Sequence, residues 1–569
     1  MKHLPLLSLL LCTLMLLAPM TAFAETPPAE EGQGLLITEI CFNPAWKEGD
    51  EQIEDNADVF PYVEIYNPTD RTISLSELSL TYRSDAGEVL ESGALLCAGD
   101  APTLAPGEIA VVVLYNAKSW TLLGLDNTAD SAAAVWETFV ELHGIADLLD
   151  KNHLYVVSNK DFKLDKESTN ATMELFCGGF INSFTYDAVY YNRNNRAVVF
   201  GADGSCMGSA MPRPGAIYDN QIPNNPELVP DTLTIPIKAV EYNICASGIP
   251  NDYEDIPFIA DRQDEAFALI EAEDPDLIVL CEVNFAWQEY ILAFCEKNGY
   301  TAYGYSSAGR DFHGSLGKTK WDLNSLLLWK TDRFDVVEQN RFWCSSTPDK
   351  KGSNKWDGGL TGDMARCINY AILKDKASGV EFLFMGVHLD AKSEEIRTLS
   401  AQLIYERAHS LAGDRSMLLM GDWNSNQTRE SYSIMTSGDL ADARFRTADT
   451  NLHGTFNKWG EYSADFQTRL PIDHCIISKE TVWVESYKQV GGPAIENVPH
   501  PSDHNMTVFS LLLSTGEPIP ETTEAETTQP VEGDHDMATS PTGCKATVGA
   551  GIIVVLASLG ASFVTKRRS

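Results

Sequence analysis

The sequence predicts an all-β region, then an α/β domain, then a single C-terminal membrane-spanning helix. Residues 35–220 contain short apolar runs separated by turn-forming residues, which is typical of a β-rich region. Residues 235–513 alternate buried-strand patterns with amphipathic helix patterns, which indicates an α/β domain. Residues 546–564 carry no charged residue and are long enough to cross a bilayer. A chain of 569 residues exceeds a single core, so at least two domains are expected.

Both ends of the chain carry targeting signals. Residues 1–24 read as a signal peptide, with Lys2, an apolar run and an Ala22-Phe23-Ala24 cleavage site. An N-terminal membrane span is the less favoured alternative because the apolar run is short. Basic residues follow the C-terminal apolar segment, which predicts a cytoplasmic C-terminus; a buried soluble helix is the alternative. The layout predicts a single-pass protein at the extracellular face of a cell membrane, and a bacterial setting fits it.

The β-rich region begins with strand patterns at 35–40, 62–66 and 109–114. A turn signal at Asn67-Pro68 follows the run at 62–66, and another at Pro106-Gly107 precedes the run at 109–114. With Ile37-Thr38-Glu39-Ile40 and Tyr62-Val63-Glu64-Ile65-Tyr66, this region resembles a lamin-tail domain, which implies an immunoglobulin-like β-sandwich. The resemblance implies a binding or spacer module of unknown partner and no catalytic residues. An insertion near 117–190 departs from that pattern and predicts a helix with Val135, Phe139 and Leu142 on one face.

Two helix–strand units recur in the α/β domain, after a Pro/Asn-rich linker at 221–234. A helix over 261–270 is expected to end before Asp274-Pro275, and a buried strand over 277–280 follows. A second helix over 393–412 precedes a buried strand over 417–420. Its inward face is predicted to hold Ile396, Leu399 and Leu403. Residues 514–543 are rich in Thr, Glu and Pro and predict a disordered stalk.

Polar residues stand at the tips of apolar runs throughout this domain. Taken singly, each has an ordinary explanation, such as a turn residue for Asn243 or a core histidine for His388. Together they indicate a site, because polar groups that converge at the ends of buried strands form ligand sites. The tips are Asn243, Glu282, His388, Asp422 with Asn424, Asp473, and Asp503 with His504.

In this order, these tips and their strands resemble the endonuclease/exonuclease/phosphatase superfamily over about 235–513. The motifs are Val240-Glu241-Tyr242-Asn243-Ile244, Asp276–Glu282, Gly386-Val387-His388-Leu389-Asp390, Gly421-Asp422-Trp423-Asn424, Ile472-Asp473-His474 and Pro501-Ser502-Asp503-His504. The resemblance implies a four-layer α/β sandwich, in which two packed mixed sheets are flanked by helices. Cys281 departs from the pattern, because a Gln commonly stands before the metal-binding Glu.

The resemblance also implies a role for each residue. Asn243 and Glu282 would hold a divalent cation with help from Asp503, most simply Mg²⁺, with Mn²⁺ or Ca²⁺ as alternatives. His504, oriented by Asp473, would take a proton from the attacking water. The remaining candidates would act on water or phosphate: Asp422 would orient the water, Asn424 would hold the scissile phosphate, and His388 and Arg366 would contact phosphate oxygens.

Composition leaves the substrate open. The net charge of −39 disfavours tight nonspecific binding to nucleic acid, which requires Lys and Arg. The leading hypothesis is a membrane-tethered, metal-dependent phosphodiesterase acting on nucleic acid, because lamin-tail-like modules beside such domains suit nucleases. The alternatives are a phosphatase or phospholipase-C-like enzyme for inositol phosphates or phospholipids, and a catalytically inactive surface-binding protein. No Cys/His cluster has zinc-like spacing, and Cys344 and Cys367 are either a disulfide or two buried thiols.

Overall fold

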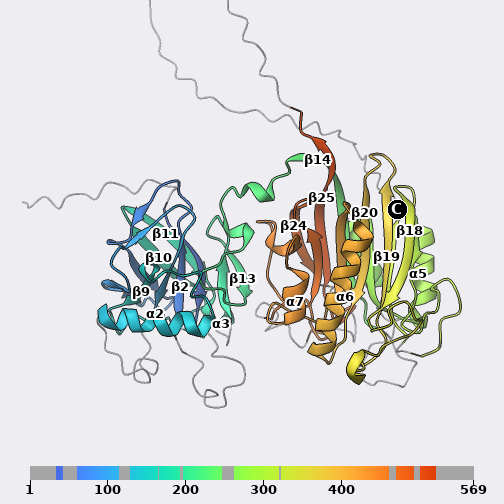
Figure 1. The fold of residues 1–569 in the computed structure, drawn as a ribbon, viewed down its shortest axis with the longest axis horizontal. Helices are drawn as coiled ribbons and strands as arrows, with labels where there is room; N and C mark the ends of the chain where they lie inside the picture. The colour runs from blue at the N-terminus through green and yellow to red at the C-terminus, as the bar shows by residue number, and fades with distance from the viewer. Residues whose placement is uncertain are drawn as a thin grey trace, which may run out of the picture. The chain divides into compact units, whose positions relative to one another are not determined.

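A computed structural model describes the fold, and its elements are labelled in Figure 1. The described residues are 34–42, 60–114, 129–164, 166–191, 196–246, 260, 262–319, 322–460, 469–491 and 500–520. The predicted signal peptide, most of the predicted stalk and the predicted membrane helix lie outside them.

The N-terminal β-rich region consists of two main sheets packed face to face. A seven-stranded sheet has the order β13-β12-β1-β2-β8-β9-β6, and a four-stranded sheet has the order β11-β10-β4-β5. Side chains from both, such as Ile65 and Met173, belong to one buried core between the sheets. The strands are β1 (Leu36–Cys41), β2 (Tyr62–Tyr66), β4 (Ser79–Arg83), β5 (Val89–Glu91), β6 (Leu95–Cys97), β8 (Ile109–Val113), β9 (Leu154–Val157), β10 (Ala171–Cys177), β11 (Phe180–Tyr186), β12 (Ala197–Phe200) and β13 (Cys206–Ala210), with a small pair β3 (Ile73–Ser74) and β7 (Thr103–Leu104).

One helix covers the outer face of the seven-stranded sheet. Helix α2 (Ala129–His143) buries Val135 and Phe139 against β-strand side chains such as Tyr62, and Leu142 packs at the margin of that cluster. The predicted helix in the insertion is therefore confirmed. A short helix α3 (Ala188–Tyr191) follows β11. The 3₁₀ turn η2 (Asp219–Gln221) ends where the predicted linker begins, and η3 (Pro226–Leu228) lies within the linker.

The α/β domain is built on two six-stranded mixed sheets, of orders β16-β17-β15-β14-β25-β24 and β18-β19-β20-β21-β23-β22. Each has one parallel pair at its centre, β14 with β15 and β20 with β21. The first sheet contains β14 (Thr232–Asn243), β15 (Leu277–Val283), β16 (Tyr300–Tyr303), β17 (Asn324–Lys330), β24 (Val482–Val490) and β25 (Met506–Pro518). The second contains β18 (Phe334–Trp343), β19 (Cys367–Asp375), β20 (Glu381–His388), β21 (Ser416–Asp422), β22 (Leu440–Asp442) and β23 (Asp473–Ser478).

The sheets pack against each other, and helices cover their outer faces. The core between them joins Val279 and Leu327 of the first sheet to Phe384 and Leu418 of the second. Helices α4 (Gln263–Glu273) and α5 (Phe285–Asn298) cover the first sheet, and α6 (Glu394–Ala412) and α7 (Glu430–Met435) cover the second. In Figure 1, α6 runs alongside β20. The domain therefore has the four layers that the sequence resemblance implied.

The inward face of α6 differs from the predicted one. Ile396 is buried, but Leu399 and Leu403 are only partly buried. The other buried residues of α6 are Arg397, Ile404 and four small residues, which allow the helix to lie close to the sheet: Ser400, Ala401, Ala408 and Ala412. Leu399 and Leu403 are the large apolar residues of this segment, so the pattern predicts a face about one position away from the observed one.

The predicted membrane-spanning helix is corrected here. Among the residues that the structure describes, no helix is both long and apolar enough to cross a bilayer. The single-pass topology and the placement at the outer membrane face rested on that helix and are withdrawn with it. Strand β25 also continues to Pro518, past residue 513 where the α/β domain was predicted to end. Cys344 and Cys367 are buried free thiols, not a disulfide.

Candidate functional site

The predicted site residues lie in strands of both sheets of the α/β domain or directly beside them. Parallel neighbours end at the same edge of a sheet, and an antiparallel neighbour begins there. Asp422 consequently pairs with His388 at the ends of β20 and β21, and with Asp473 at the start of β23. The first sheet supplies three groups at its own edge: Asn243 from the end of β14, Glu282 from β15, and Asp503-His504 just before β25.

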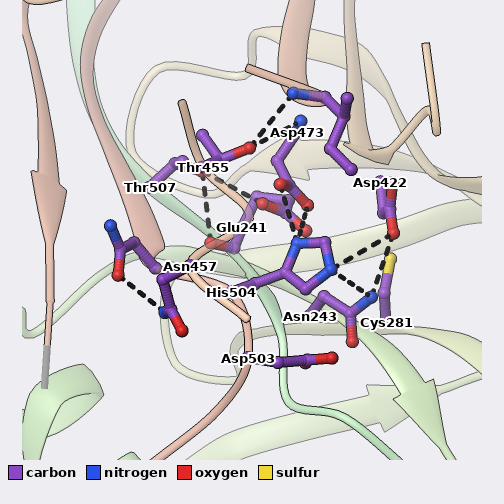
Figure 2. A network of polar contacts seen from close by, with 12 residues as sticks. Glu241, Asn243, Cys281, Asp422, Thr455, Asn457, Asp473, Asp503, His504 and Thr507 are labelled. Atoms are coloured by element: carbon purple, nitrogen blue, oxygen red, sulfur yellow. Dashed lines mark hydrogen bonds and ion pairs between the residues drawn. The ribbon is translucent and has the colours of Figure 1, made fainter. Parts of the chain in front are cut away.

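His504 and Asp473 form the centre of the site (Figure 2). His504 Nδ1 lies 2.9 Å from Asp473 Oδ2 and 3.1 Å from Oδ1. The main-chain N–H of Asp473 donates to Thr455 Oγ1 at 3.1 Å, which fixes the main chain that carries this carboxylate. Because a carboxylate accepts the Nδ1 proton, the Nε2 atom of a neutral His504 is free to accept another. His504 Nε2 lies 3.8 Å from Asp422 Oδ2.

Asn243 joins the two sheets at this point. Its Nδ2 donates to Asp422 Oδ2 at 3.0 Å, lies 3.4 Å from Glu282 Oε1 and 3.5 Å from His504 Nε2. Glu282 adopts a left-handed backbone with φ of +63°, and its Oε2 accepts the N–H of Ala246 at 2.9 Å. A non-glycine residue in this region stores strain that is typical of functional sites. The strand end thus turns the Glu282 carboxylate toward Asn243.

A close approach between β20 and β21 fixes the Asp422 loop. Gly421 has φ of +153°, and a Cβ there would lie 1.8 Å from the carbonyl oxygen of Val387. Only glycine fits this position. After it, Asn424 adopts a left-handed backbone with φ of +47°, its N–H donates to Asp422 Oδ1 at 2.8 Å, and its Nδ2 donates to Leu389 O at 3.2 Å.

His388 and Arg366 lie on the second-sheet side of the site. His388 Nε2 is 3.6 Å from Asp422 Oδ2. Burial, with help from the positive charges of Arg366 and His504, holds the pKa of His388 well below its usual range. His388 is therefore a neutral hydrogen-bonding group near pH 7. Arg366 is buried and its Nη2 contacts both oxygens of Asp363, at 3.2 and 3.1 Å, while its Nε has no hydrogen-bond partner among the described residues.

The site concentrates negative charge. Burial, reinforced by the Asp473 carboxylate, raises the pKa of Asp422 to about 7. Burial raises the pKa of Asp503; His504 opposes this shift and the nearby Glu282 adds to it. Burial acts to lower the pKa of His504, but Asp473, Asp422 and Asp503 outweigh it and raise that pKa well above the usual value.

These donors suit a hard divalent cation. The ligand atoms of Asp422, Asp473 and His504 lie within 4.8 Å of one another, close enough to hold a metal ion. An ion among those three would compete with the hydrogen bond between His504 and Asp473. Glu282 and Asp503, beside Asn243, offer carboxylate oxygens without that competition, and oxygen ligands are those that Mg²⁺ prefers. Burial, together with neighbouring carboxylates, raises the pKa values of Asp422 and Asp503, and a bound cation would offset the repulsion between the carboxylates.

Two residues of the site were missed at the level of sequence. Glu241 is fully buried on β14; its Oε2 accepts a hydrogen bond from the Thr507 hydroxyl at 3.1 Å, and its Oε1 has no partner in the part of the chain that the structure describes. A carboxylate in the middle of an apolar strand was the available signal. Arg262 is also buried and donates to the carbonyls of Cys245 at 2.6 Å and Pro501 at 2.9 Å, which ties the loop after Asn243 to the loop before Asp503. Nothing in its local sequence indicated that role.

The comparisons with known proteins concern the same domain. Residues 259–504 match the Endonuclease/Exonuclease/phosphatase family. An endonuclease/exonuclease/phosphatase family protein from Bacteroides thetaiotaomicron is 25% identical, with a TM-score of 0.42, over 49% of this chain and 99% of that chain. A mannosyl-6-phosphatase from Bacteroides thetaiotaomicron VPI-5482 is 26% identical, with a TM-score of 0.41, over 48% and 99%. The human Nocturnin catalytic domain is 18% identical, with a TM-score of 0.38, over 50% and 96%.

No curated protein matches the sequence. The N-terminal region falls outside the family match, so its resemblance to a lamin-tail domain stays a prediction. Strand order, the polar strand ends and the family match concern the same stretch of chain and agree with one another. The fold and the polar strand ends of the α/β domain therefore agree with the match of residues 259–504 to the Endonuclease/Exonuclease/phosphatase family.

Proposed function

We propose that this domain is a divalent-metal-dependent phosphodiesterase that cleaves nucleic acid, with Mg²⁺ as the cation. The pairing of His504 with Asp473 carries the proposal, because it directs an imidazole nitrogen toward Asp422 and Asn243. A histidine oriented by a carboxylate is a general base suited to activating water. A cation held by Asn243, Glu282 and Asp503 would supply charge neutralisation for the phosphate oxygens.

The roles follow from the contacts. His504 Nε2 removes a proton from water that Asp422 orients, while Asp473 keeps the Nδ1 proton in place and stabilises the imidazolium that forms. Asn424 and His388 flank Asp422 and donate hydrogen bonds to phosphate oxygens. Their donors are held before substrate arrives, which is the condition for electrostatic stabilisation of a transition state.

Arg366 supplies the positive charge of the phosphate-binding side. Its guanidinium is already engaged by Asp363 through Nη2, which leaves the unpartnered Nε and the remaining N–H groups for a phosphate oxygen. A planar guanidinium held at one side binds phosphate oxygens in a defined direction. Arg366→Lys is therefore expected to keep the charge but to lose most of this contribution.

A second candidate is the hydrolysis of a small or lipid-borne phosphate, such as an inositol phosphate or a phospholipid headgroup. The charge of the chain favours it: at −39, the protein has little cationic surface to follow a long phosphate backbone. A small substrate needs only the local set of Arg366, His388 and the cation. The site geometry described above is the same for both candidates.

One assay separates these candidates. Purified protein would be incubated with Mg²⁺ or with EDTA and supplied with plasmid DNA, RNA, sphingomyelin, phosphatidylinositol or an inositol phosphate. Nucleic-acid cleavage that EDTA abolishes supports the proposed nuclease, and release from the lipid or inositol phosphate supports the second candidate. His504→Ala should eliminate whichever activity is found, whereas His409→Ala, in a surface His–Asp pair with Asp439 at 2.8 Å, should not. Full activity of His504→Ala would refute the mechanism.

A further inference from the structure

The loop that follows β21 presents Asn424 to the site in a strained conformation. Asn424 has a left-handed backbone, and its side-chain Nδ2 donates to Leu389 O. The next residue, Ser425, is buried with 1% of its surface exposed. Whatever holds Ser425 therefore sets the direction in which Asn424 points.

Two groups hold Ser425 from the side away from the site. Its hydroxyl lies 2.5 Å from that of Ser431, which in turn lies 3.0 Å from Glu394 Oε1 at the start of α6. Its carbonyl oxygen lies 2.8 Å from Nε2 of His474. A carbonyl oxygen only accepts hydrogen bonds, so Nε2 of His474 is the protonated nitrogen and donates.

The other nitrogen of His474 is held by a buried ion pair. His474 Nδ1 lies 2.9 Å from Asp442 Oδ2 and 2.8 Å from Arg444 Nη2, while Arg444 Nε donates to Asp442 at 3.1 Å. Tyr432 donates its hydroxyl to Asp442 at 3.0 Å, and its ring packs on the imidazole with centroids 5.1 Å apart. His474, Asp442 and Arg444 are all nearly inaccessible to solvent. Contacts on both nitrogens thus fix the orientation of the imidazole.

His474 adjoins Asp473 on β23, and neighbouring residues of a strand face opposite sides of the sheet. Asp473 faces the site and orients His504. His474 faces the helices and supports the loop of Asn424. One strand therefore holds the general base from one face and the phosphate-binding loop from the other.

We propose that His474 is a positioning residue for phosphoester hydrolysis: its Nε2–H anchors the Ser425 carbonyl and so holds Asn424 in the geometry that contacts the transition state. The inference rests on the proposed function for its kinetic readout, and its structural readout is independent of it. Residues that orient groups in direct contact with substrate typically contribute about 10- to 100-fold to activity. The loss should fall on kcat, because the misplaced Asn424 serves the transition state more than substrate binding.

The test compares two amides that differ in reach. In His474→Gln the amide can still donate to Ser425 O and accept from Arg444, whereas in His474→Asn the side chain is too short to reach Ser425. We expect His474→Gln to keep kcat within about threefold of wild type and His474→Asn to lose about 10- to 100-fold, with KM little changed in both. Main-chain amide exchange at residues 424–426 should accelerate in His474→Asn alone.

The outcomes separate the two proposals. Inactive wild-type protein refutes the proposed function, and unchanged amide exchange at 424–426 in folded His474→Asn refutes the positioning role. Equal kcat for folded His474→Asn and wild type also refutes it. If both variants fail to fold, ¹⁵N chemical shifts of His474 in the wild-type protein decide: a protonated Nε2 between pH 6 and 8 supports the role, and an unprotonated Nε2 overturns it.

Discussion

Replacing Asp473 with Asn tests whether His504 is the general base. The substitution keeps the size of the side chain and the main-chain hydrogen bond to Thr455, but removes the charge that accepts the Nδ1 proton of His504. An amide can turn its NH₂ group toward Nδ1, which then accepts. The proton of a neutral His504 would move to Nε2, and the base would be lost.

The expected size of the effect follows from that change of tautomer. Where a carboxylate that orients a catalytic histidine becomes an amide, kcat falls by about 10⁴, or roughly 5.4 kcal/mol in the activation free energy. The pH profile should also move. Asp473 is the largest of the charges that raise the pKa of His504, so its removal lowers that pKa. Activity requires neutral His504, hence the acid limb of the residual activity should shift to lower pH.

The assay is kcat and kcat/KM against pH at saturating Mg²⁺, on a substrate identified as described above. Asp439→Asn is the matched control, because Asp439 pairs with His409 at 2.8 Å on the protein surface. Its activity should equal that of wild type, and its stability should change by about 1 kcal/mol or less. A folded Asp473→Asn protein with kcat within about tenfold of wild type would refute the reasoning, as would an acid limb that moves to higher pH.

Further perturbations probe the metal site, the charges and the backbone. Removal of Mg²⁺ with EDTA should abolish activity, and Mg²⁺ at about 100 times its Kd should stabilise the protein by roughly 2.7 kcal/mol in denaturant titrations; Glu282→Gln should weaken Mg²⁺ binding measured by calorimetry at least about tenfold. The folded-state pKa of Asp422 is raised to about 7, so the free energy of unfolding of metal-free protein should fall as pH rises from about 4 to 7, by no more than roughly 4 kcal/mol. Asp422→Asn should make the free energy of unfolding depend less on pH over this range. An unaltered pH dependence contradicts the assignment. Gly421→Ala should destabilise the protein by several kcal/mol or prevent folding, since its Cβ would lie 1.8 Å from Val387 O. Gly413→Ala, with open space around its Cβ, should destabilise it by only about 1 kcal/mol. Similar melting temperatures for the two variants would contradict the close approach at Gly421.

The fold of the α/β domain was largely predictable because its strands and helices have different periods. The sequences of β15 and β21 are continuous apolar runs, and the pattern over 393–412 predicts a helix that matches α6. The inward face of α6 was misplaced, because burial of Ser400 and Ala401 depends on how closely the helix approaches the sheet. That distance depends on tertiary packing and cannot be predicted from the sequence of the helix alone.

The site was predictable where polar residues interrupt apolar strands, and not where long side chains reach across loops. Asn243, Asp422 and His504 could be recognised together, and the structure brings them within hydrogen-bonding distance. Arg262 could not, since it acts through the carbonyls of two loops that are distant in sequence. The role of His474 could not be predicted either, because it depends on the position of Ser425, which is distant in sequence.

The pairing of β14 with β25 affects how the chain can be made. Along the chain, β14 is the first strand of its sheet and β25 the last, and Asn243 meets His504 across a separation of 261 positions. A ribosome that adds about 5–20 residues per second needs roughly 13–52 s to cover that distance. During that time β14 has an unpaired edge, which is a template for wrong association. Synthesis that stops before His504 would leave a nascent chain with most of its core, an open sheet edge and no general base, so premature termination should yield aggregation-prone material with no partial activity.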